Sequence, residues 1–107
     1  MEKVKILYKP EVEDFFVDLV LLLFREDYFS YLENAESYKN NIIDFVENSI
    51  TTFPSHKTLL KLIDFGSNYI FYKSNSRTTW FVFFEKHKSN YLVTHIINNH
   101  CEEAKWL

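Results

Sequence analysis

The residues of this 107-residue chain that are best suited to chemistry lie in its last third. Arg77 stands at the entrance of the apolar stretch TTWFVFF, and the next apolar stretch, YLVTHIINNH, ends on Asn98, Asn99 and His100. An imidazole, whose ordinary pKa is about 6.5, can donate or accept a proton at neutral pH. A nearby guanidinium can stabilise the charge that develops on a phosphate. This pattern raises the hypothesis of a site at the end of the last strand.

Each of these residues also has an interpretation without chemistry. Asn98 and Asn99 favour turns and helix caps, because their short side chains bond to nearby backbone groups. His100 fits an ordinary passage from strand to helix, and Arg77 fits a solvated position at a strand entrance. For His100 and Arg77 both interpretations stay open, and for the two asparagines the cap is preferred.

A metal site is not predicted, and no cofactor is expected. His95 and His100 are five residues apart, so on one strand they face opposite sides. Adjacent His100 and Cys101 do not have a usual zinc-chelating spacing. On its strand His95 is in phase with Tyr91, Val93 and Ile97, a pattern that predicts a half-buried histidine.

The first half of the chain has helical patterning. Residues 4–9, VKILYK, alternate as a strand, and Pro10 then suits the first position of a helix. Apolar residues follow on one helical face: Val12, Phe15, Phe16, Leu19, Val20 and Leu23. After a break at residues 25–29, Ser30 and Glu33 predict a capping box for a second helix that runs to about Thr52, before Pro54.

After Gly66 the pattern changes to that of strands. Residues 69–73, 78–86 and 91–97 are rich in aromatic and β-branched residues, and short polar connections predict antiparallel hairpins. Residues 80–84 are apolar at every position, which predicts a central strand or one covered on both faces. Residues 55–67 fit either a short helix or an extended edge segment, and the tail CEEAKWL has helical character.

Together these elements predict one α+β domain over residues 1–107. It has an N-terminal strand, a helical hairpin on one face of a mostly antiparallel sheet, three further strands in that sheet and a short C-terminal helix.

The net charge of −3 argues against a generic nucleic-acid-binding protein, which is usually basic. Residues 1–50 carry five Lys or Arg against eleven Asp or Glu, a net charge of −6, and residues 51–107 carry seven against four, a net charge of +3. The two halves are therefore expected to occupy different faces, unless the acidic residues only mark solvated helices. A lone cysteine, no signal-peptide pattern and no apolar run near 20 residues predict a cytoplasmic protein without a membrane contact.

The element order resembles the RelE/ParE superfamily of bacterial toxins, from type II toxin–antitoxin modules. The motifs that carry the resemblance are RTTWFVFF, YLVTHIINNH and the tail AKWL. They are similar to a group with an R/K-TTW-[YF]-VFF strand followed by a strand that ends in NNH. The resemblance covers the whole chain in topology and residues 77–107 in motif.

The resemblance implies a toxin that a cognate antitoxin silences. RelE-like members enter the ribosome and cut mRNA in the A site without a metal, using the 2′-hydroxyl as nucleophile, whereas ParE-like members inhibit DNA gyrase. By position, His100 would be the general acid on the 5′-oxygen leaving group. Arg77 falls about one residue from an arginine of active relatives, and in a strand that shift exchanges the two faces.

The remaining predicted substrate contacts follow from the same resemblance. Lys73, with Lys57 and Lys61, would hold the scissile phosphate, and Asn98 and Asn99 would contact RNA. Trp106 stands near the place of a tyrosine in relatives, so it can stack on a base but cannot transfer a proton. Three hypotheses result: an mRNA endonuclease, a gyrase inhibitor favoured by the presence of only two arginines, and a non-catalytic antitoxin-binding member.

Overall fold

The computed structural model describes residues 4–25, 32–52, 55–74 and 76–107. Along the chain the elements are β1 (Lys5–Tyr8), α1 (Pro10–Arg25), α2 (Leu32–Ser49), β2 (His56–Lys57), the 3-10 helix η1 (Leu60–Phe65), β3 (Asn68–Lys73), β4 (Thr79–His87), β5 (Asn90–Asn98) and the 3-10 helix η2 (Glu102–Trp106). The α+β prediction and its element order are confirmed. Ser30 of the predicted capping box and Pro54 lie outside the described residues.

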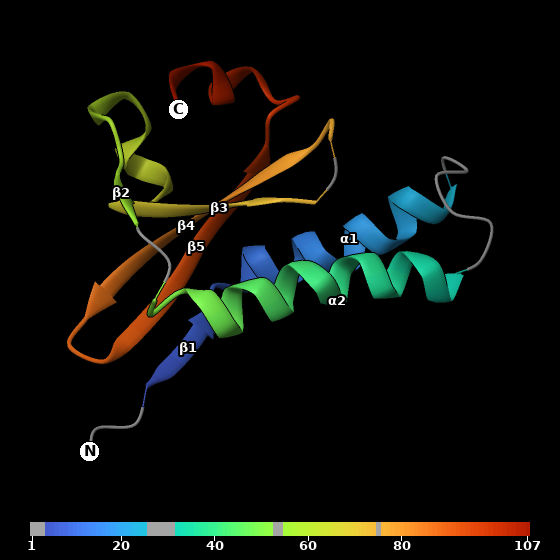
Figure 1. Ribbon diagram of the computed structural model, residues 1–107, viewed down its shortest axis with the longest axis horizontal. Helices are drawn as coiled ribbons and strands as arrows, with labels where there is room; N and C mark the ends of the chain where they lie inside the picture. The colour runs from blue at the N-terminus through green and yellow to red at the C-terminus, as the bar shows by residue number, and fades with distance from the viewer. Residues whose placement is uncertain (1–3, 26–31, 53–54, 75) are drawn as a thin grey trace.

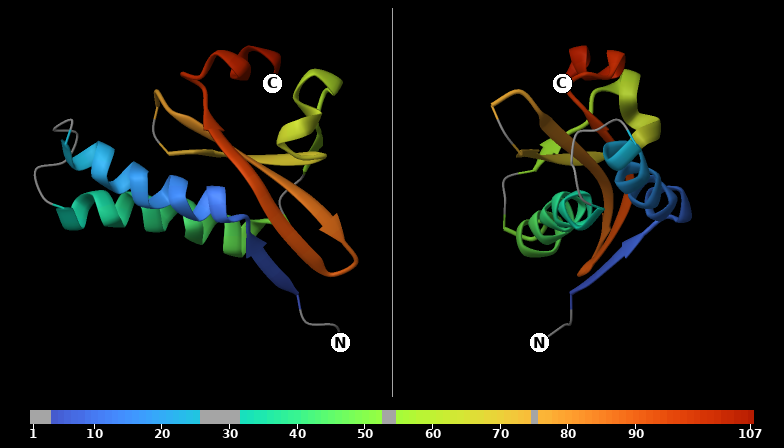
Figure 2. Two further views of the ribbon diagram at one scale, coloured as in Figure 1. Left: turned by 180° about the vertical axis from the view of Figure 1, so that it is seen from behind. Right: turned by 90° about the vertical axis from the view of Figure 1, so that its right-hand side faces the viewer.

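The two helices form as the apolar spacing predicts. Pro10 is the first residue of α1, and Glu11 and Glu13 in the first turn oppose the positive end of the helix dipole. The predicted face of α1 is buried at Val12, Phe16, Leu19 and Val20, and α2 buries Ala35, Ile42 and Val46. Figures 1 and 2 show α1 and α2 side by side, with their far ends extending past the sheet.

The five strands form one sheet in the order β1-β5-β4-β3-β2. β1 pairs in parallel with β5, and the other neighbours are antiparallel. β4 therefore lies at the centre, as the unbroken apolar run of residues 80–84 predicted. A parallel β1 joined to α1 by a short connection brings that helix back against β5.

The ambiguous segment 55–67 contains both of the structures that its sequence allowed. His56 and Lys57 form a two-residue edge strand on β3, and residues 60–65 then form η1. Four strands, β2 to β5, therefore follow the two helices in the chain, whereas three were predicted. The C-terminal helix is one short 3-10 segment, a geometry that suits five residues better than an α-helix does.

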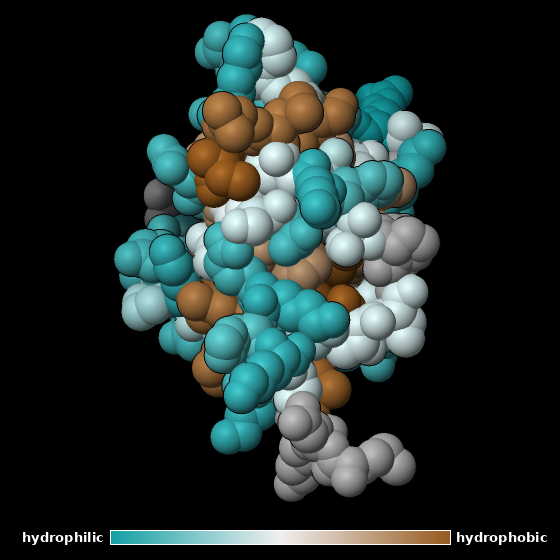
Figure 3. All heavy atoms as spheres, turned by 90° about the vertical axis from the view of Figure 1, so that its left-hand side faces the viewer, coloured by the Kyte–Doolittle hydropathy of each residue, from teal (hydrophilic) through white to brown (hydrophobic). Residues whose placement is uncertain are grey.

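The main core lies between the helices and the sheet. Three of its strand residues, Ile70, Val82 and Val93, are fully buried. The opposite face is covered by η1 over only part of its area, where Leu62 and Phe83 are buried and Phe65 packs edge-on against Phe83. Figure 3 views the molecule from the end that carries β2 and η1, where hydrophobic side chains lie on the surface. The exposed apolar residues beside and within η1 are Leu59, Leu60 and Ile63.

A β-bulge in β5 overturns the predicted orientation of His95. Phe83 pairs with His95 but Phe84 pairs with Val93, so Thr94 is an extra residue. Its hydroxyl donates to the Phe65 carbonyl on the η1 side, and His95 stacks on the Phe65 ring. A bulge shifts the alternation by one residue. The predicted phase of His95 with Val93 was therefore wrong, and so was its phase with Tyr91, since both residues belong to the helix-side core.

No helix in the described ranges is long and apolar enough to cross a membrane.

Candidate functional site

The end of β5 meets the start of β4 at a tightly bonded turn, here called the NNH corner (residues 77–79 and 98–101). The Asn99 amide oxygen accepts the Thr79 N–H at 2.9 Å, and its amide nitrogen donates to the Arg77 carbonyl at 3.0 Å. The Asn99 N–H also donates to the Thr79 carbonyl at 3.0 Å. Asn99 therefore joins the end of β5 to the start of β4 and to Arg77, through its backbone N–H and its side-chain amide.

Asn98 builds the turn that follows. Its side-chain oxygen accepts the His100 N–H at 2.9 Å, and the Cys101 thiol lies 3.6 Å from the same oxygen. The Cys101 N–H donates to the Asn98 carbonyl at 3.1 Å. The Asn98 side chain thus bonds locally, as its residue type favoured. The Asn99 side chain instead bonds to residues 20 and 22 positions earlier in the chain. Neither asparagine forms the preferred helix cap, because the N-cap residue of η2 is Cys101 and has no side-chain cap bond.

His100 reaches the exposed side of the corner. Its Nε2 atom lies 3.4 Å from the Thr78 hydroxyl, and both His100 and Arg77 are exposed side chains. The corner thus brings the segment of Arg77 and that of His100 together, although 22 positions separate Asn99 from Arg77 in the chain. An imidazole, a guanidinium, a hydroxyl and amides form a set that suits an anion better than a cation.

A chain of hydrogen bonds anchors this corner to α2. The Trp80 indole N–H donates to the Tyr38 hydroxyl at 2.9 Å, and that hydroxyl lies 2.9 Å from the Ser74 hydroxyl. Ser74 then bonds the Thr78 carbonyl through its own hydroxyl at 3.2 Å and through its N–H at 3.0 Å. Because the chain begins in the packed core, the turn that carries Arg77 is held by the body of the protein.

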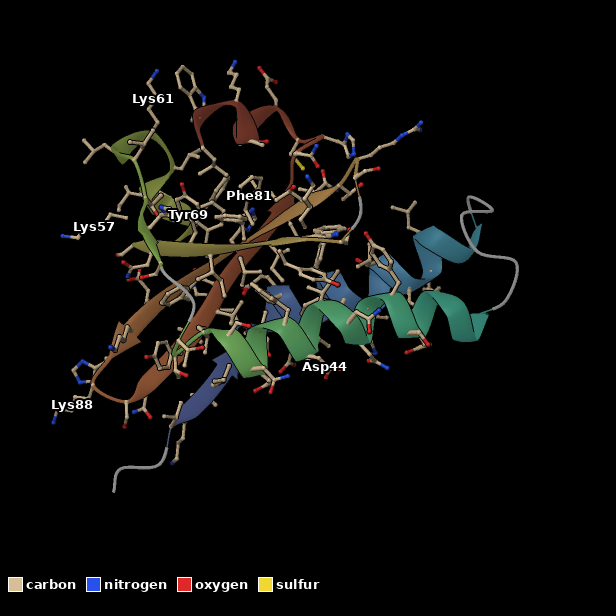
Figure 4. All side chains as sticks on the ribbon, viewed as in Figure 1. Asp44, Lys57, Lys61, Tyr69, Phe81 and Lys88 are labelled. Atoms are coloured by element: carbon tan, nitrogen blue, oxygen red, sulfur yellow. The ribbon has the colours of Figure 1, made fainter. Side chains whose placement is uncertain are left out.

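The other predicted binding residues do not all join the corner. Lys73 is exposed and pairs with Thr79, so it ends β3 next to the corner. Trp106 lies on η2, where the Lys61 ammonium sits 3.4 Å from the centroid of the indole ring. This cation–π contact links η2 to η1. Lys57 lies on the edge strand and points away from the sheet (Figure 4).

A row of aromatic rings lies on the sheet face away from the helices. His56 stacks on Tyr69 with ring centroids 5.3 Å apart and on Phe71 at 5.7 Å. Phe81 meets Tyr69 edge-on at 6.1 Å, and Figure 4 shows Tyr69 and Phe81 on the same side of the sheet. The alternation of residues 69 and 71 was the available signal, because it separates them from Ile70 in the core.

Charged side chains lie on both layers of the molecule. α1 and α2 carry exposed carboxylates, among them Glu13, Asp14 and Asp44. The sheet end carries exposed Lys73 and Arg77, while Glu85 accepts bonds from the N–H and the hydroxyl of Ser67. Glu102 and Glu103 of η2 directly follow the corner and are also exposed, so this end of the sheet carries charges of both signs.

Histidine 95 belongs to a different environment from His100. Burial lowers the pKa of His95, and the negative charge of Glu103 opposes that shift. His95 also stacks on Phe65 with centroids 4.0 Å apart. Within the ranges that the structure describes, no group of three or more His, Cys, Asp or Glu side chains could hold a metal ion.

Comparisons of this chain with protein-family models, with curated proteins and with solved structures found no match.

Proposed function

We propose that the protein is the toxin of a type II toxin–antitoxin module and that it cuts mRNA in the ribosomal A site. The observation that carries this proposal is the NNH corner, where Asn99 clamps the segment of Arg77 beside the turn of His100. The strand order, with β1 parallel to β5 and two helices between them in sequence, supports the RelE/ParE-type architecture. A cognate antitoxin is the expected protein partner.

In the proposed reaction the 2′-hydroxyl of one nucleotide attacks the adjacent phosphorus and releases its proton to water. The bond from phosphorus to the 5′-oxygen breaks, and His100 gives that oxygen a proton. The products are a 2′,3′-cyclic phosphate and a 5′-hydroxyl. Arg77 and Lys73 stabilise the negative charge on the non-bridging oxygens. Positioned proton transfer of this kind is worth roughly 10²–10⁴ in rate.

The test is primer extension on a defined mRNA in a reconstituted translation reaction. We expect wild type to cut at the A-site codon and His100→Ala to cut about a hundredfold or more slowly. His87→Ala is the matched control, since His87 is an exposed histidine at the other end of β4. Undiminished cutting by both His100→Ala and Arg77→Ala would rule out the mechanism. Intact mRNA under conditions where a control toxin cuts would rule out the function.

The second candidate is a gyrase inhibitor that acts by protein contact. The use of both asparagines in building the turn and the presence of only two arginines in the chain favour it. Stoichiometric inhibition of DNA supercoiling, with mRNA left intact, would establish this alternative. Absence of growth arrest on expression would instead point to a member that only binds its antitoxin.

A further inference from the structure

α1 carries more apolar surface than its packing against the sheet and α2 uses. Its inner face is buried, yet three aliphatic side chains on its other side are strongly exposed: Val17 at 61%, Leu21 at 47% and Leu22 at 51%. A surface helix normally has one apolar stripe and a polar remainder. An exposed apolar cluster of this kind marks an interaction surface.

Two hollows border these side chains. The first, of about 370 Å³, is lined by Phe15, Asp18, Leu19, Leu21 and Leu22. The second, of about 230 Å³, lies where α1 meets α2 and is lined by Tyr8, Glu13, Phe16, Val17, Lys39 and Ile43. Figures 1 and 2 show that the distal part of α1 extends past the sheet. The surface is therefore ridged and hollowed, as helix packing requires.

The carboxylates around this surface indicate which charge a binding partner should carry. α1 (Pro10–Arg25) contains four carboxylates and a single cationic residue, Arg25, at its last position. Two of these carboxylates, Glu11 and Glu13, are in the first turn and offset the helix dipole, but Asp18 lies in the middle of the helix and lines the larger hollow. On α2 the only described lysine, Lys39, is bonded to Glu36 at 3.0 Å. A partner must therefore supply both apolar side chains and positive charge.

We propose that this α1 surface (Phe15, Val17, Asp18, Leu21 and Leu22) binds a basic amphipathic helix of a partner protein. The partner helix sets its apolar side chains into the larger hollow and its Lys or Arg side chains beside Asp14 and Asp18. A second copy of this chain would oppose carboxylate to carboxylate at the same surface, and an anionic membrane would be repelled. The inference does not depend on the chemistry of the NNH corner.

The first test uses two labelled peptides of about five helical turns. Both have leucines at i, i+3, i+4 and i+7, and one has Lys on its flanks where the other has Glu. By fluorescence anisotropy we expect the Lys peptide to bind with a micromolar Kd and the Glu peptide not to bind. Asp14→Asn with Asp18→Asn should weaken binding of the Lys peptide and reduce its salt dependence.

The variant L21S/L22S should weaken binding of the Lys peptide about tenfold or more. The matched control is L59S/L60S, because these leucines are also exposed, at 54% and 88%, and lie at the other end of the molecule. None of the four is in the core, so circular dichroism should show both variants folded. Equal binding of the two peptides, or equal loss in the two variants, would overturn the proposal.

Two other possible occupants of the α1 surface, a second copy of this chain and a lipid surface, are tested without added peptide. We expect sedimentation velocity to show a monomer, and flotation to show no binding to vesicles of phosphatidylcholine with phosphatidylglycerol. A dimer that L21S/L22S dissociates would assign the surface to a second copy, and vesicle binding that the same variant abolishes would assign it to a lipid surface. Either result would overturn the proposal.

Discussion

Ile70 and Phe71 are neighbours on β3, yet they belong to two very different faces of the sheet. Ile70 faces the helices and is fully buried, whereas Phe71 faces away and is 37% exposed. The helix side is a continuous apolar core. The other side is covered by η1 in part and elsewhere presents a row of rings next to Lys73. One face is therefore a closed core, and the other is only partly covered.

The largest expected difference comes from truncating these two neighbours. Ile70→Ala should lower the free energy of unfolding by about 3 kcal/mol, because it removes a fully buried side chain and leaves a cavity. Phe71→Ala should cost about 1 kcal/mol, since its side chain is only partly buried and 37% of it is already exposed to water. Urea unfolding monitored by tryptophan fluorescence measures both values. Equal losses would show that the second face is as much a core as the first.

The covered part of the second face depends on Gly66. Its backbone has φ of +155°, and a Cβ there would lie 2.5 Å from the Thr94 hydroxyl and 3.0 Å from the Phe83 Cβ. Gly66→Ala should therefore lower the free energy of unfolding by about 2 kcal/mol, since η1 must move away from the sheet. Ser37→Ala, at an exposed position of α2, is the control. A fully stable Gly66→Ala protein would mean that η1 is not closely packed.

The smallest expected effect is a pH dependence of the free energy of unfolding that comes from His95 on the second face. His95 has a lowered pKa in the folded protein because of burial, opposed by Glu103. The unfolded chain therefore binds the proton more readily, so His95 adds stability above its ordinary pKa of about 6.5 and loses it as pH falls through the lowered value. Stability measured from neutral to mildly acidic pH should fall more in wild type than in His95→Gln. Parallel curves would contradict this assignment.

Several parts of the fold could be predicted because local patterns decide them. The helical spacing from Val12 to Val20 specified the buried face of α1, and the unbroken apolar run of residues 80–84 specified a central strand. The turn-forming tendency of Asn98 depends on its own short side chain, which does accept the N–H of His100 two residues on.

Other parts depend on contacts between segments that are distant in the sequence. The two-residue β2 exists only because β3 pairs with it, and the orientation of His95 depends on a bulge between β4 and β5. Trp106 was predicted as a substrate contact, and its contact with Lys61 links two 3-10 helices that are 37 residues or more apart in the chain. No local pattern contains such pairings.

By itself, then, the sequence determined most of the elements, the buried face of α1 and the local turn at Asn98, because periodicity and short-range hydrogen bonding act within a few residues. The tertiary structure decided the parallel pairing of β1 with β5, the division of the sheet into two unlike faces and the placement of the Arg77 segment beside the turn that carries His100. Those features arise from strand register and packing, which only the folded chain brings into contact.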